Sequence, residues 1–127
     1  MKIMTSVLIA VALTAAGGAA AGALEECMIK GDQAAVSRCL IDAEREAQAA
    51  LIKVEGDAGK RARDLDVATG RSGAAAALAK SMRAFVDYRK AQCDFVRAMY
   101  ASGNGADNGQ LGCMVDITRR RVRDFTN

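Results

Sequence analysis

Four cysteines, at positions 27, 39, 93 and 113, constrain the fold of this 127-residue chain more than any other feature. Zinc modules bring cysteine ligands in close pairs such as C-x2-C, whereas the nearest two cysteines here are twelve positions apart. An even number of cysteines in a small exported chain is typical of disulfides. Three pairings are possible, and we favour Cys27 with Cys39 and Cys93 with Cys113, because nearest neighbours close the shortest loops.

Residues 1–23 have the pattern of a secretory signal peptide. A lysine follows Met1, an apolar run covers residues 3–16, and an Ala-x-Ala motif ends at Ala23. The apolar run is shorter than the roughly 20 residues of a membrane-spanning helix. Cleavage near Ala23 would leave a domain of 104 residues (127 − 23), residues 24–127, in the periplasm or outside the cell. Cys27 is not expected to carry a lipid anchor, because residues 24–26 are Leu and Glu rather than small residues.

The residue types in the chain argue against catalysis. There is no histidine, the commonest general base and metal ligand. The glycine-rich residues 102–109 follow a predicted helix rather than a strand, so they do not form a phosphate-binding loop. Loss of Lys2 would leave 17 basic residues (18 − 1) and 15 acidic ones, a net charge of +2 that is too balanced to indicate nucleic acid. The sequence therefore predicts a binding protein with no catalytic site, metal or cofactor.

Helices are predicted almost throughout, because the chain has no proline and many helix-forming residues. Asp32 can cap the first long helix, since its carboxylate can accept hydrogen bonds from free amides. The next apolar positions recur every three or four residues and form one buried face: Val36, Leu40, Ala43, Ala47, Leu51 and Val54. Gly56 and Gly59 predict a bend or break in this helix. Gly70 is predicted to end it, and Ser72 to cap the next helix.

A second long helix is predicted up to about Ala101. Its apolar face is formed by Leu78, Met82, Phe85, Arg89, Val96 and Met99, with Tyr88 and Cys93 beside it. Residues 102–109 lack periodicity, and their glycines and asparagines are candidates for unusual backbone angles. A last helix is predicted from about Leu111 to Phe125, with Asp116 paired with Arg120. Together these elements predict an all-α fold, a small three- or four-helix bundle stapled by two disulfides.

Two arginines occupy positions within apolar lines. Arg89 lies four residues after Phe85 and four before Cys93, and Arg121 lies four residues before Phe125. A buried guanidinium group must be paired. We interpret both arginines as structural, held in an ion pair or by helix-end carbonyls; the alternative is an anchor at the rim of a binding surface.

Several motifs in the second half of the chain occur together in one known family. They are the segment Leu78–Cys93 with its Tyr88-Arg89-x-x-x-Cys93 pattern, the glycine-rich loop, Cys113, and Thr118-x-x-Arg121-x-x-x-Phe125. In these motifs, and in a first cysteine pair at positions 27 and 39, the chain resembles the LprI-like lysozyme inhibitor family. It departs from the family at Phe85, where many members have tryptophan, and between Gln48 and Glu55.

The resemblance implies an exported helical protein that binds lysozyme and occludes its cleft without chemistry of its own. A structural or adaptor protein of the cell envelope, without a membrane anchor, is the alternative. The residues expected to be structural or to bind a partner are Phe85, Tyr88, Arg89, Asp107, Thr118 and Arg121. Common animal lysozymes are strongly cationic, so charge would not steer a chain near +2 toward them. We therefore expect short-range contacts, with residues 102–109 entering the cleft and Asp107 facing its cationic surroundings.

Overall fold

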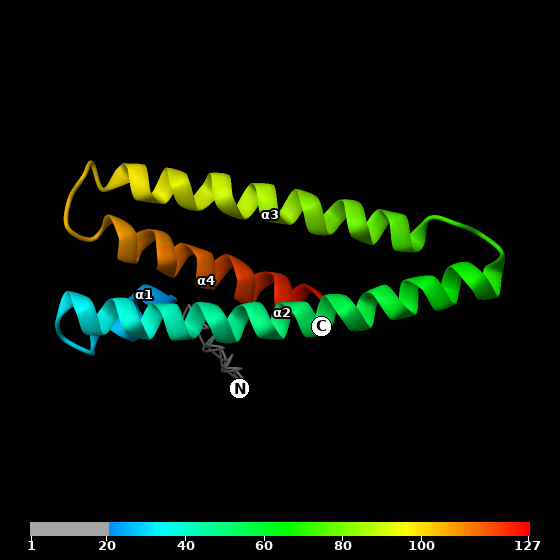
Figure 1. The fold of residues 1–127 in the computed structure, drawn as a ribbon, viewed down its shortest axis with the longest axis horizontal. Helices are drawn as coiled ribbons and strands as arrows, with labels where there is room; N and C mark the ends of the chain where they lie inside the picture. The colour runs from blue at the N-terminus through cyan, green and yellow to red at the C-terminus, as the bar shows by residue number, and fades with distance from the viewer. Residues whose placement is uncertain (1–20) are drawn as a thin grey trace, which may run out of the picture.

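The computed structural model describes residues 21–127, which form four helices. They are α1 (Ala23–Met28), α2 (Gln33–Thr69), α3 (Ala74–Met99) and α4 (Ala106–Asp124). Figure 1 shows α2 and α3 as a long hairpin, with α4 running back between them from its open side. The predicted all-α fold is confirmed. Residues 1–20, which hold most of the predicted signal peptide, lie outside the described residues. None of the helices in residues 21–127 is long and apolar enough to cross a membrane.

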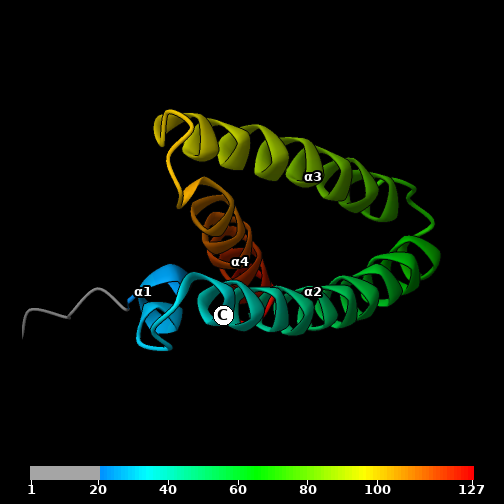
Figure 2. The ribbon, with the colours of Figure 1, turned by 60° about the vertical axis from the view of Figure 1, so that its left-hand side comes forward.

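The core lies where α1, α2 and α4 meet. Figure 2 shows α2 and α3 spreading apart at this end of the molecule, with α4 between them. The cluster of buried side chains consists of Ala23, Cys27, Val36, Leu40, Ala47 and Val115. The apolar face predicted on α2 is therefore confirmed, because Val36, Leu40, Ala47 and Leu51 are buried and Ala43 and Val54 are half-buried.

Two disulfides connect the helices at this end. Cys27 is bonded to Cys39, which ties α1 to α2, and Cys93 is bonded to Cys113, which ties α3 to α4. The predicted pairing is thus confirmed. α1 was not predicted, because six residues are too few to show a period. It packs closely on α4, where a Cβ added to Gly112 would lie only 3.0 Å from the Cβ of Leu24.

The predicted break in the first long helix does not occur, since α2 runs without interruption through Gly56 and Gly59. A glycine inside a helix costs only about 1 kcal/mol relative to alanine. Ion pairs one turn apart support the helix on both sides of the glycines, with Lys53 Nζ 2.8 Å from Asp57 and Lys60 Nζ 2.6 Å from Asp64. The helix ends at Gly70, whose φ of 63° is the left-handed conformation expected there.

The start of α3 is capped by a residue that was not predicted to cap it. Ser72 makes no cap; instead Asp66, on the last turn of α2, accepts hydrogen bonds from the backbone N–H groups of Ala74 (3.0 Å) and Ala75 (3.1 Å). The bond from Ala75, followed by that from Ala74, lowers the pKa of the Asp66 carboxyl below its usual value. The Asp66 carboxylate thus joins the last turn of α2 to the first turn of α3 at the tip of the hairpin.

The C-terminal end of α3 and the start of α4 also differ from the prediction. α3 ends at Met99, and α4 begins at Ala106, five residues before Leu111, so the loop is shorter than expected. Met99, assigned to the apolar face, is 69% exposed, whereas Cys93 beside that face is fully buried. The disulfide to α4 turns the Cys93 side of α3 inward.

Two parts of the molecule can now be distinguished. The disulfide end comprises α1, residues 33–55 of α2, residues 81–99 of α3, and α4, and it contains every buried residue of the described chain. The hairpin end comprises residues 56–80, where α2 and α3 lie beyond the reach of α4, and none of its residues is buried.

Candidate functional site

A tight turn from Tyr100 to Gly105 joins α3 to α4 at the disulfide end. Ala101 and Ser102 have left-handed backbone angles, with φ of 46° and 68°. The prediction had assigned unusual angles to the glycines and asparagines instead. A left-handed conformation in a residue with a Cβ costs on the order of 1 kcal/mol or more. The turn keeps this strained shape, and residues 101–104 at its tip are exposed.

Packing against α4 holds the turn in place. A Cβ added to Gly109 would lie 2.4–2.8 Å from atoms of the Tyr100 ring, so the ring can rest on α4 only because residue 109 is glycine. The Cys93–Cys113 disulfide crosslinks the two helices near the turn. Arg97 adds polar links, since its Nη1 lies 2.8 Å from Asp107 Oδ1 and donates to Gln110 Oε1 at 3.1 Å. The turn is therefore fixed by covalent, steric and polar contacts.

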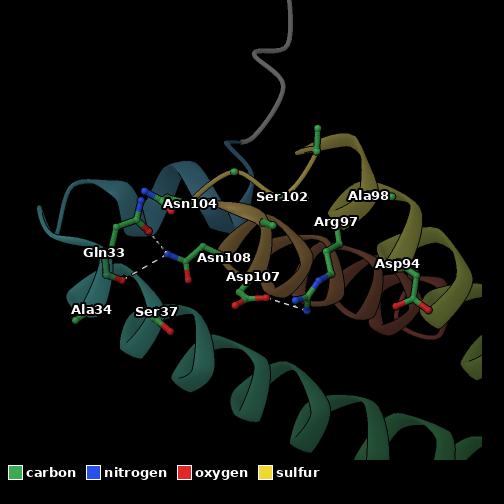
Figure 3. Close-up of a pocket in the computed structure, with 14 residues that line it drawn as sticks. Gln33, Ala34, Ser37, Asp94, Arg97, Ala98, Ser102, Asn104, Asp107 and Asn108 are labelled. Atoms are coloured by element: carbon green, nitrogen blue, oxygen red, sulfur yellow. Dashed lines mark hydrogen bonds and ion pairs between the residues drawn. The ribbon is translucent and has the colours of Figure 1, made fainter.

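An open groove of about 1020 Å³ lies beside the turn, between the start of α2 and the end of α3. Figure 3 shows its polar side chains, which come from three helices: Gln33 and Ser37, Asp94 and Arg97, Asp107 and Asn108. Asn108 donates from Nδ2 to Gln33 Oε1 at 2.8 Å and so links α4 to α2. The bond from Lys90, with help from Gln110 and Arg97, lowers the pKa of the Asp94 carboxyl. These intramolecular contacts hold the polar side chains of the groove in place.

The described residues do not form a metal-binding site. Within residues 21–127, no group of three or more His, Cys, Asp or Glu side chains is placed to hold a metal ion. The groove carboxylates are engaged, Asp107 with Arg97 and Asp94 with Lys90 and Gln110.

Arg89 is held by neutral partners. Its Nη1 donates to Gln48 Oε1 and to Thr118 Oγ1, both at 2.9 Å, and Thr118 in turn donates to the carbonyl of Met114. The guanidinium carbon lies 5.6 Å from the centre of the Phe85 ring, while the buried Nε has no partner in the described residues. The expected ion pair or helix-end carbonyls are replaced by an amide and a hydroxyl, so Arg89 links α3 to both α2 and α4.

Arg121 forms an ion pair, one of the two structural arrangements predicted for it. Its Nε lies 3.3 Å from Glu55 Oε1, and both side chains are largely buried. Its Nη2 donates to Ser81 Oγ at 2.9 Å, and its guanidinium carbon lies 5.3 Å and 4.8 Å from the ring centres of Phe85 and Phe125. Sequence reasoning missed Glu55, although its position four residues after Leu51 places it on the buried face of α2.

The candidate residues therefore separate into two groups. Phe85, Arg89, Thr118 and Arg121 come together in one cluster, which we call the arginine cluster. Asp107 lies apart from them in the first turn of α4, and Tyr88 is 54% exposed on α3.

The predicted pair of Asp116 with Arg120 is not present. Asp116 Oδ1 instead accepts the backbone N–H of Ala23 at 2.9 Å, because α1 packs over this part of α4. Arg119, one turn before Arg123 on α4, pairs with Glu26 of α1 at 2.9 Å.

Comparison with known proteins identifies the family. The family model described as lysozyme inhibitor LprI matches residues 26–125, which include all four helices except the first three residues of α1. No similar protein was found among curated proteins, and no similar fold among solved structures. The match contains both disulfides, the turn and the arginine cluster, so this chain belongs to the LprI lysozyme inhibitor family.

Proposed function

We propose that this protein is exported to the cell envelope or beyond it, where it binds lysozyme and occludes the active-site cleft without catalysis of its own. Membership of an inhibitor family supports lysozyme as the target. The two disulfides are typical of proteins that leave the cytoplasm. The observation that carries the proposal is the rigid, exposed turn between α3 and α4.

The turn has the properties of an inhibitory element. The exposed residues 101–104 are Ala, Ser, Gly and Asn, so the tip is narrow enough to enter a cleft. A flexible loop would lose conformational entropy on binding, whereas this turn is already held by the Tyr100 ring and the Cys93–Cys113 bond. Rigidity before binding lowers the entropic cost of association and so increases affinity.

Short-range contacts would dominate the interaction. The chain has a slight positive charge, so it gains little from steering toward a cationic lysozyme. Asp107 is paired with Arg97 but remains 76% exposed in its side chain, and it can accept further hydrogen bonds. We expect inhibition that changes little with added salt and weakens in Asp107→Ala.

The decisive experiment measures lysozyme turnover on cell-wall substrate with excess purified protein. Asn104→Trp places a bulky ring on the exposed turn and should reduce inhibition at least tenfold. The matched control is Arg61→Trp, an equally bulky change at an exposed position of the hairpin end, which should inhibit like the parent. Equal inhibition by both variants would show that the turn does not enter the cleft.

Replacement of Cys93 and Cys113 by Ser tests the role of rigidity. The variant should lose inhibition, because the turn is freed even where the rest of the bundle stays folded. Retained inhibition would contradict the importance of a fixed turn.

An adaptor in the envelope is the second candidate function, and the exposed apolar side chains of α3 favour it. Phe95 and Met99 are 57% and 69% exposed on a helix that is covered by α4 on one side only. No inhibition at micromolar concentration with both disulfides intact would favour this function.

A further inference from the structure

Ala23 is an integral part of the folded domain. It is the first residue of α1, is 0% exposed and belongs to the core cluster. Its backbone N–H donates to Asp116 Oδ1 at 2.9 Å, a contact that joins residues 93 positions apart. Cleavage after Ala23 would remove this side chain from the core and delete the amide that binds Asp116.

A second Ala-x-Ala motif lies two residues upstream, in Ala19-Ala20-Ala21. We infer that the leader is removed after Ala21, so that the mature chain begins at Gly22 and keeps Ala23 in the core. Gly22 itself is extended, with φ of −72° and ψ of 164°, and it leads into the first turn of α1. The inference rests on the proposed export of the chain and is independent of lysozyme binding.

Two carboxylates converge on Gly22. A Cβ added to Gly22 would lie 2.7 Å from Glu25 Oε2 and 2.8 Å from Asp116 Oδ2. A backbone nitrogen lies about 2.5 Å from its own Cβ position, so the Gly22 nitrogen lies no more than about 5.3 Å from either oxygen. Neither carboxylate forms an ion pair with a lysine or arginine of residues 21–127.

A free α-ammonium group on Gly22 supplies the missing positive charge. Such a group opposes the helix dipole at an N-terminus, and it therefore needs anions nearby. Asp116 and Glu25 provide them, and the resulting contact attaches the start of the mature chain to α4. A longer N-terminus would place its ammonium group elsewhere and leave both carboxylates without this partner.

The first test is to express the full chain with export and to determine the N-terminus of the product by intact mass and sequencing. The expected product spans residues 22–127. A product that begins at Leu24, one that begins upstream of Gly22, or a chain that is not cleaved would each overturn the inference.

The second test measures the thermal stability of purified chains that begin at Gly22 or at Leu24, and of the Gly22 form with an acetylated α-amino group. Acetylation should lower the melting temperature by roughly 2–4 °C, and the Leu24 form should melt lower still or fail to fold. In Asp116→Asn the effect of acetylation should shrink, while in Asp124→Asn, a change to an exposed carboxylate two turns further along α4, it should persist.

Equal melting temperatures for the free, acetylated and Leu24 forms would overturn the assigned start and its ion pair. Lysozyme inhibition should be the same for the free and acetylated Gly22 forms, because the turn lies elsewhere. A protein that starts at Gly22 yet does not inhibit lysozyme would contradict only the proposed function.

Discussion

At the disulfide end, α2 and α3 are separated and bridged by α4, whereas at the hairpin end no third helix of residues 21–127 lies between or beside the same two helices. The disulfide end holds both crosslinks, the core cluster and the arginine cluster. The hairpin end has no buried residue, and its polar contacts are local, such as Lys60 with Asp64 and Asp66 with the start of α3.

The difference shows that one helix can be stabilised by two mechanisms along its length. The first half of α2 is held by burial of Val36, Leu40 and Ala47. Its second half depends on helix propensity, on ion pairs one turn apart and on the cap at the hairpin tip. Because ion pairs one turn apart are each worth only a few tenths of a kcal/mol and no residue is buried there, the hairpin end should open far more readily than the disulfide end.

The largest expected effect contrasts two leucines of α2. Leu40→Ala should lower the free energy of unfolding by about 3–4 kcal/mol, because Leu40 is fully buried in the core. Leu65→Ala, in the hairpin end where Leu65 is 55% exposed, should change it by less than about 0.5 kcal/mol. Urea unfolding measures the free energy of unfolding of both variants. A similar decrease in the two would refute the distinction between the ends.

Arg89→Ala should lower the free energy of unfolding by roughly 2–3 kcal/mol, because it leaves Gln48 and Thr118 without their charged donor. Arg89→Lys should be more stable than Arg89→Ala but less stable than the parent, since an ammonium group cannot reproduce the planar set of N–H donors of a guanidinium group. The control is Arg83→Ala, an exposed arginine on the same helix. If Arg89→Ala melts like the parent but fails to inhibit lysozyme, the arginine cluster belongs to the binding interface.

Two glycine substitutions should have opposite signs. Gly109→Ala should cause a net loss of about 1 kcal/mol, because the new methyl group collides with the Tyr100 ring. Gly56→Ala should stabilise the protein by about 0.5–1 kcal/mol, because it meets no atom within 4 Å and raises helix propensity. Thermal unfolding measures the stability of both variants. In a Tyr100→Ala protein, Gly109→Ala should no longer destabilise, because the ring that its methyl group meets is absent. A stabilising Gly109→Ala in the parent would show that the ring can move away without cost.

The smallest effect concerns the cap at the hairpin tip. The pKa of Asp66 is lowered in the folded protein, so its contribution to stability is present above the ordinary Asp pKa of 3.8 and is lost as the pH falls through the folded pKa. Asp66→Asn should raise amide hydrogen exchange in residues 66–80 at neutral pH without changing exchange in residues 36–47.

A pH titration followed by NMR provides an independent check, because the Ala74 and Ala75 amide shifts should follow Asp66 with a midpoint below 3.8. Changes in exchange that spread into the core would mean that the two ends unfold together.

The candidate site was predicted only in part. Arg89 and Arg121 were recognised from their positions in apolar lines, Phe85 as part of an apolar face, Thr118 only through the family resemblance, and the turn from its glycine-rich composition. Gln48, the main partner of Arg89 on α2, was not recognised as such, because 41 residues separate the two in sequence. The groove beside the turn could not be predicted, since its walls come from α2, α3 and α4.

The sequence by itself determined the features that depend on neighbours a few residues apart. Helical periodicity identified the buried face of α2 and Asp32 and Gly70 its two ends, and the spacing of the cysteines favoured the observed disulfide pairs. The tertiary structure decided the features that need distant partners: Asp66 capping α3, Asp116 binding Ala23, and α4 filling the space between α2 and α3. The reason is that capping and ion-pairing groups have several acceptable partners of similar energy, and only packing selects among them.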